Sequence, residues 1–98
     1  MYIYLKHVMV AGLTGSITSA HFHAGGPGET GPIIFIICGN MTGASLCQPW
    51  VYWLQGAWPG ARDHVADIAA GRVYVNLHTA AYPAGEVRAQ VREDVVCV

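Results

Sequence analysis

Histidines are the residues of this chain whose spacing most suggests chemistry. His21 and His23 stand two positions apart in a stretch with the composition of a β-strand, and His78 lies near the end of another such stretch. Successive side chains of a strand point to opposite faces, so His21 and His23 share one face. Neutral imidazole nitrogens bind zinc at about 2.0–2.1 Å, and copper accepts the same donors. His21, His23 and His78 are therefore candidate ligands of a copper or zinc ion.

Two charged residues are expected close to these histidines. Residues 72–79 and 86–98 alternate apolar and polar side chains, and the turn between them would make a hairpin. The hairpin would place His78 near Glu86 and Arg88, with Glu86 accepting a hydrogen bond from an imidazole N–H. This pairing predicts a polar cluster of the three histidines, Glu86 and Arg88.

The same cluster has a second interpretation, in which it braces a loop and binds no metal. The imidazoles would donate hydrogen bonds to backbone carbonyls of the glycine-rich loop, residues 25–31, and to Glu86. Arg88 would complete an ion pair with that carboxylate. Spacing alone does not show whether three ring nitrogens converge on one point, so both interpretations stay open at this stage.

The rest of the chain is typical of strands separated by turns rich in glycine and proline, with one exception. Val65, Ile68 and Ala69 recur at helical spacing between Asp63, which can cap a helix, and Gly71, which can end one. Short strands divided by such turns are typical of antiparallel sandwiches and barrels. We predict one all-β domain, residues 1–98: an antiparallel Greek-key-like β-sandwich with one short helix. Its strands are expected at residues 2–10, 16–24, 33–38, 51–55, 72–79 and 86–98, with residues 33–38 buried on both faces.

Composition and charge exclude several classes of protein. Of the 98 residues, 53% are hydrophobic and 11% are charged, where about 25% charged is usual. This apolar excess excludes a disordered chain. Five basic and six acidic residues give a net charge of -1, which argues against nucleic-acid binding because that needs a basic surface. The longest apolar run, Ile33 to Cys38, is far shorter than the roughly 20 residues of a membrane-spanning helix.

Three cysteines, an odd number, allow at most one disulfide within the chain. Cys38 and Cys47 are the closest pair in sequence and the first candidates for this bond, which would leave Cys97 free. Asn40 begins an Asn-Met-Thr triplet, which is a glycosylation acceptor in secreted proteins. Both features are compatible with an oxidising compartment.

The segment before the predicted helix is rich in tryptophan. Trp50, Trp53 and Trp58 could stack against a sugar, or could fill the core and an interface between chains. Packing is the more common use of tryptophan in a small domain. A carbohydrate-binding platform is therefore the weaker alternative.

The two histidine motifs also carry a family resemblance. The sequence is similar to the CHRD domain, first named from chordin, in Ala20-His21-Phe22-His23-Ala24-Gly25 with Gly31-Pro32-Ile33, and in Asn76-Leu77-His78-Thr79 with Pro83-Ala84-Gly85-Glu86-Val87-Arg88. The resemblance covers most of the chain and departs from the family over residues 47–61. It implies a β-sandwich-like domain, usually extracellular, with no established enzymatic activity. It also implies that His21, His23, His78, Glu86 and Arg88 lie close together, without deciding whether they hold a metal.

Two functions follow from these features. The first is an extracellular or cell-surface structural domain, not an enzyme, that self-associates into an oligomer or filament through strand edges at Tyr2 to Val10 and Asp94 to Val98. The low charge, the apolar excess and the spare cysteine motivate this hypothesis. The alternative is a copper- or zinc-binding protein that uses the three-histidine site.

Overall fold

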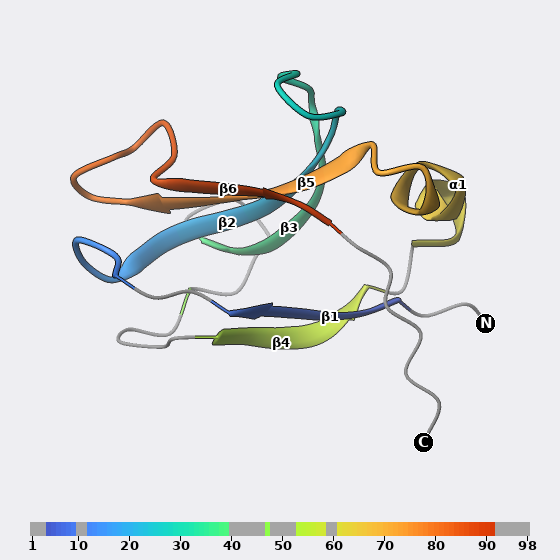
Figure 1. Ribbon diagram of the computed structural model, residues 1–98. Coiled ribbons are helices and arrows are strands. Elements are labelled where there is room, and N and C mark those ends of the chain that lie inside the picture. Colours follow the sequence, from blue (N-terminus) through green and yellow to red (C-terminus); the bar gives the residue numbers. More distant parts are fainter. Residues whose placement is uncertain (1–3, 10–11, 40–46, 48–52, 59–60, 92–98) are drawn as a thin grey trace.

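The computed structural model describes residues 4–9, 12–39, 47, 53–58 and 61–91, which form two antiparallel sheets and one helical segment (Figure 1). A two-stranded sheet pairs β1 with β4, and a four-stranded sheet has the order β3-β2-β5-β6. The strands are β1 (Tyr4–Met9), β2 (Ile17–Ala24), β3 (Ile33–Gly39), β4 (Trp53–Trp58), β5 (Val73–Thr79) and β6 (Val87–Gln90). A 3-10 turn, η1 (Ala61–His64), leads into the helix α1 (Val65–Ala69).

The prediction of a mostly β fold with one short helix is confirmed, while the sandwich and the Greek-key connection stay predictions. Two local expectations are wrong. The strand predicted at residues 33–38 is not buried on both faces, because β3 is an outer strand of its sheet and Ile33 is 41% exposed. Asp63 does not cap α1, because it lies inside the 3-10 turn and the helix starts after His64. Gly71 follows the helix with a φ of 74°, the left-handed conformation that suits a helix end.

The pairing of β2 with β5 has a regular register from Ser19 to Ala24, and this register separates the two faces of the four-stranded sheet. Phe22 pairs with Val75, and these residues belong to the buried core. His21 pairs with Asn76 on the opposite face, since neighbouring positions of a strand alternate. The register irregularities of β2 beside its histidines lie only on the β3 side. The sheet therefore has one apolar face and one polar face.

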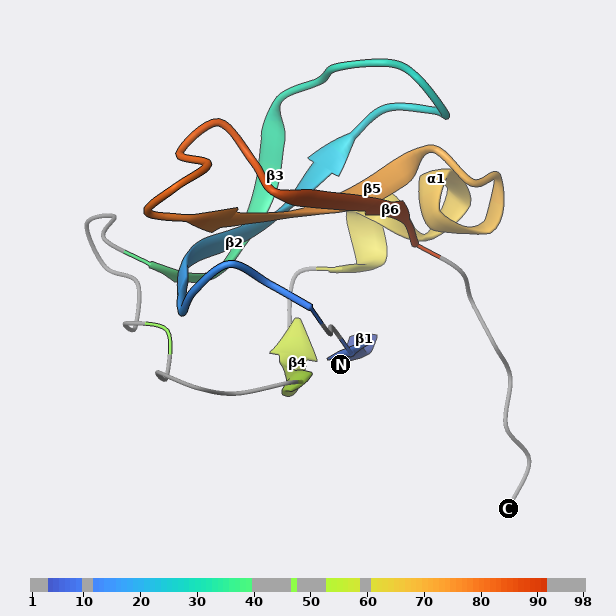
Figure 2. The same ribbon diagram turned by 60° about the vertical axis from the view of Figure 1, so that its left-hand side comes forward.

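Two loops cover the polar face. One loop, residues 25–32, joins β2 to β3, and the other, residues 80–86, joins β5 to β6. Figures 1 and 2 show both loops on the side of the four-stranded sheet that is turned away from β1 and β4. Backbone from both loops therefore covers the polar face.

A disulfide bond joins Cys38 to Cys47, the pair that the sequence favours, with the two Cα atoms 4.9 Å apart. Cys38 belongs to the buried core and Cys47 packs against it. Among the helices of the described residues, none is long and apolar enough to cross a membrane.

Candidate metal centre

The polar face brings the three predicted histidines together. One ring nitrogen from each of His21, His23 and His78 lies within 4.8 Å of the others. His21 and His23 come from β2, and His78 from β5 lies diagonally across from His21 because it pairs with Ser19. The ring centroid of His21 is 5.7 Å from that of His23 and 5.0 Å from that of His78.

These distances are short enough for one ion to bind all three rings. Three atoms no more than 4.8 Å apart lie within about 2.8 Å of a common point, against about 2.0–2.1 Å for a zinc–imidazole bond. Side-chain adjustments of under about 1 Å would therefore bring the three nitrogens into a metal's coordination shell. No other group of three histidine, cysteine or acidic side chains among the described residues is this close.

Backbone carbonyls determine which nitrogen two of the histidines present. Nδ1 of His23 lies 2.9 Å from the carbonyl oxygen of Gly31, and Nδ1 of His78 lies 2.8 Å from that of Pro83. A carbonyl oxygen only accepts hydrogen bonds, so both Nδ1 atoms carry the proton. The neutral form of each ring then has a bare lone pair on Nε2. Each covering loop thus holds one histidine in the form that can bind a metal.

Four ring nitrogens of this cluster are buried without a hydrogen-bond partner. They are both nitrogens of His21 and the Nε2 atoms of His23 and His78. His21 is only 6% exposed. Its pKa is lowered from the ordinary 6.5, first by burial and then by the nearby His78 and His23. His21 is therefore neutral at pH 7, as a metal ligand must be.

Tyr74 supports His23 from the neighbouring strand. The two rings stack nearly parallel, with centroids 4.8 Å apart, and Tyr74 is 2% exposed. The guanidinium carbon of Arg88, from β6, lies 3.6 Å from the centroid of the same tyrosine ring. Gly31 joins the two supports, because its N–H donates to the Tyr74 hydroxyl at 3.1 Å and its carbonyl accepts from His23. The position of the His23 ring therefore depends on Tyr74 and on this one glycine.

Glu86 has a different place from the one predicted for it. Its carboxylate accepts hydrogen bonds from the N–H and the hydroxyl of Thr14, at 2.9 and 2.5 Å, and from the hydroxyl of Thr79, at 2.7 Å. The expected bond to an imidazole is not formed, because the turn that contains Thr14 supplies two donors for the carboxylate. Arg88 also makes no ion pair with Glu86, and instead donates to the carbonyl of Gly26 and to Gln90.

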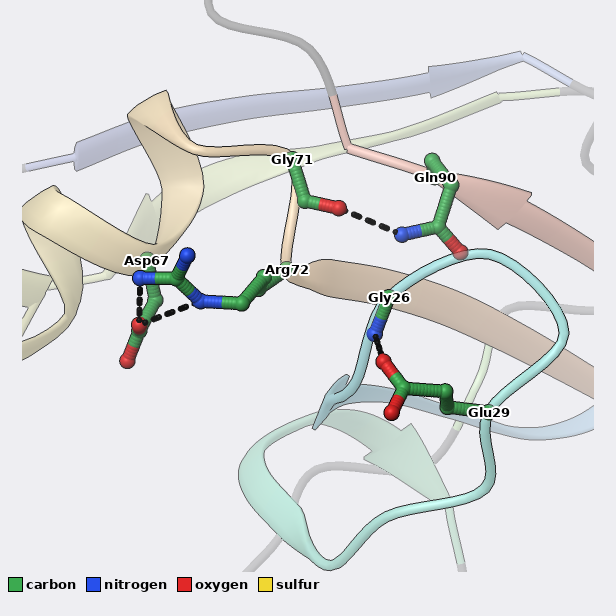
Figure 3. Close-up of polar contacts among 6 residues, drawn as sticks. All are labelled: Gly26, Glu29, Asp67, Gly71, Arg72 and Gln90. Atoms are coloured by element: carbon green, nitrogen blue, oxygen red, sulfur yellow. Dashed lines mark hydrogen bonds and ion pairs between the residues drawn. The ribbon is translucent and has the colours of Figure 1, made fainter.

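A second polar region lies beside the loop of residues 25–32, where a pocket of about 310 Å³ extends to Asp67 and Arg72. Figure 3 shows that its charged groups are already paired: Arg72 with Asp67 at 3.0 Å, and Glu29 with the N–H of Gly26 at 2.7 Å. Gln90 also holds the adjacent backbone by donating to the carbonyl of Gly71. The N–H of Gly25 also donates to the carbonyl of Arg72 at 2.7 Å, so the groups around this pocket hold the loop against the end of the helix.

Four other predictions fall outside the part of the chain that the structure describes, among them the strand edge expected at Asp94 to Val98. Asn40, Trp50 and Cys97 lie there, as do the side chains of Trp53 and Trp58. Tyr74 and Gly31 are the supporting residues that sequence reasoning missed. The alternation of β5 carries a signal for Tyr74, since Tyr74, Asn76 and His78 share a face.

Comparison with known proteins gives one result. A family model described as the CHRD domain matches residues 4–91. Comparisons with curated proteins and with solved structures gave no match.

Proposed function

Because this chain belongs to the CHRD domain family, whose members are typically found in secreted proteins, we propose that it is an extracellular domain that binds a copper or zinc ion. The ligands are His21, His23 and His78. The disulfide between Cys38 and Cys47 supports an extracellular setting, because such bonds persist in oxidising compartments.

The observation that carries the proposal is the set of four buried ring nitrogens without a partner. Buried polar atoms in folded proteins nearly always have a partner, and a cluster of exceptions in one place needs an explanation. A single ion between the rings would accept a lone pair from each of the three histidines. It would leave only one nitrogen of His21 without a partner.

The bracing interpretation explains less of the same geometry. Two of its hydrogen bonds exist, from His23 to Gly31 and from His78 to Pro83. Its other elements, a bond from an imidazole to Glu86 and an ion pair between Glu86 and Arg88, are not formed among the described residues. The two bonds that do exist are also those that orient histidines at metal sites. These two hydrogen bonds are therefore part of the proposed metal site.

Metal analysis of the protein tests this proposal. Protein purified without chelators, or stripped and reloaded, is expected to hold about one copper or zinc ion per chain. The double variant His21→Ala, His23→Ala should lose this ion, whereas His64→Ala, which removes a histidine outside the cluster, should keep it. Less than about 0.1 ion per chain, or equal binding by the double variant, would contradict the proposal.

We propose self-association as a second function of the domain. It is supported by the outer strand β3, by Ile33 at 41% exposure, and by Tyr82 at 51% exposure in the loop between β5 and β6. Outer strands and exposed apolar side chains are common contact points between copies of a chain. Light scattering over a range of concentrations tests it: growth of the particle size with concentration is expected, and a monomer throughout would exclude it.

A further inference from the structure

We propose that the metal site prefers monovalent copper, Cu(I), over zinc and over divalent copper, an inference that rests on the metal site proposed above. The donor set is the first reason. The close group consists of three imidazoles and includes no carboxylate or thiolate from the described residues. All three ligands are neutral, so they cancel none of the charge of the ion that they bind.

Three acidic side chains of the described residues are bound to other groups. Glu86 is bound by Thr14 and Thr79, and Glu29 is bound by the N–H of Gly26. Asp67 is paired with Arg72. None of the three is available to compensate an ion at the histidines without breaking contacts that the fold already makes.

Among the residues that the structure describes, the charged group beside the site is positive. Arg88 lies against one ring, Tyr74, and that ring stacks on His23. Only the ring of Tyr74 therefore separates a guanidinium from His23, one of the ligands of a cation in the site. This arrangement disfavours a second positive charge on the ion more than a first one.

Burial adds to this preference. His21 is 6% exposed, and the free nitrogens of all three rings have almost no contact with solvent. The hydration free energy that an ion loses on leaving water grows with the square of its charge, so a divalent ion loses about four times as much as a monovalent ion of similar size. Neutral ligands supply dative bonds but no negative charge to offset this difference.

Coordination number points the same way. Zinc sites with three protein ligands keep a fourth position for water, and Cu(II) prefers four ligands in a tetragonal arrangement. The free nitrogens of this cluster are buried, which disfavours a fourth ligand from solvent. Cu(I) is stable with three nitrogen donors and needs no fourth ligand. The site therefore fits the ion that has the lowest charge and the lowest coordination number of the three.

Competition titrations of the full chain test the preference. Cu(I) would be titrated without oxygen against the chromogenic chelator bicinchoninate, and Zn(II) and Cu(II) against indicators of known affinity. We expect the Kd for Cu(I) to be at least about 100-fold lower than that for Zn(II), and we expect X-ray absorption of the copper-loaded protein to show three nitrogen neighbours. Tighter or equal binding of Zn(II) or Cu(II) through the histidines would overturn the preference and leave the metal site standing. Failure of all three ions to bind in a histidine-dependent way would overturn both.

A substitution of matched size tests the charge argument by itself. Asn76 pairs with His21 across β2 and β5 on the polar face. Asn76→Asp adds a negative charge beside the ligands with almost no change in shape. Because this charge favours the divalent ion, the ratio of the Cu(I) affinity to the Zn(II) affinity should fall about 10-fold. Asn76→Ser adds no charge and should leave the ratio unchanged. An unchanged ratio in a folded Asn76→Asp protein would overturn the explanation by charge.

Discussion

The two faces of the four-stranded sheet both contain buried side chains, but their polar and apolar groups find partners in different ways. On one face, Ala20, Phe22, Val75 and Leu77 fill the core with side chains that need only one another. On the other face, His21 is as buried as the core residues Cys38 and Val75, yet both its ring nitrogens lack partners. The apolar face is complete within the chain, whereas the polar face keeps four buried ring nitrogens without a partner.

The largest effect is expected on the apolar face. Phe22→Ala removes a buried ring that stacks on Phe35 with centroids 6.2 Å apart. Such a change lowers the free energy of unfolding by about 3–5 kcal/mol, because it removes apolar contacts and leaves a cavity. Urea unfolding of the metal-free protein measures it. The matched control is Ile33→Ala, at a position 41% exposed, which should lose less than about 1 kcal/mol. Equal losses at the two positions would contradict the contrast between core and outer strand.

The next effect concerns the loop over the polar face. A Cβ atom on Gly31 would overlap the carbonyl of Ala24, so Gly31→Ala must move this part of the loop. The shift would break the hydrogen bonds that link Gly31 to His23 and Tyr74. Loss of such a support typically weakens metal binding 10- to 100-fold, and we expect a loss of about this size here.

The control for this change is another glycine with room for a side chain. Gly15→Ala meets nothing within 4 Å and should keep the affinity of the unchanged protein. Binding titrations of both variants with the same ion make the comparison. If Gly31→Ala folds and binds as tightly as Gly15→Ala, then the loop does not position His23.

A smaller effect on stability is expected from a change at His21, and this effect differs between the metal-free and the metal-loaded protein. His21→Leu replaces a ring whose buried nitrogens have no partner with an apolar side chain. The metal-free protein should lose no stability at pH 7.5, and should gain up to about 1 kcal/mol, because leaving buried polar groups unpaired is unfavourable. Thermal unfolding with and without the metal measures both states, and the stabilisation by metal should disappear. A loss above about 2 kcal/mol without metal would mean that the imidazole is already satisfied.

The sequence allowed the histidine cluster to be predicted, but not its surroundings. His21 and His23 share a face because β2 pairs regularly with β5, and the period of two is a local property that sequence displays. The partner of Glu86 is not local, since Thr14 is 72 positions away in the chain. The place of β3 at the outside of the sheet is equally invisible, because an apolar run has the same composition in an outer or a central strand. Contacts between distant segments decided the expectations that failed for Glu86 and for β3.

The smallest effect concerns the polar groups on the apolar side of the sheet. It tests whether these groups have hydrogen-bond partners, in contrast to the histidine nitrogens on the other side. Thr79 is 1% exposed, and its hydroxyl donates to Glu86. Hydrogen bonds from Thr14 and Thr79 favour the charged carboxylate, so the pKa of Glu86 is lowered from its ordinary value of 4.5. A carboxyl group with a lowered pKa stabilises the folded protein above the pKa of the unfolded chain, and this contribution is lost as the pH falls through the lower folded value.

Glu86→Gln should therefore reduce stability modestly at pH 7, and the difference from the unchanged protein should shrink as the pH falls below about 4.5. Urea unfolding at a series of pH values follows this difference. Thr14→Val removes one of the donors and should show the same pH dependence, with little further loss when both changes are combined. A difference that stays constant from pH 7 to pH 3 would mean that the carboxylate charge is not what the threonines bind.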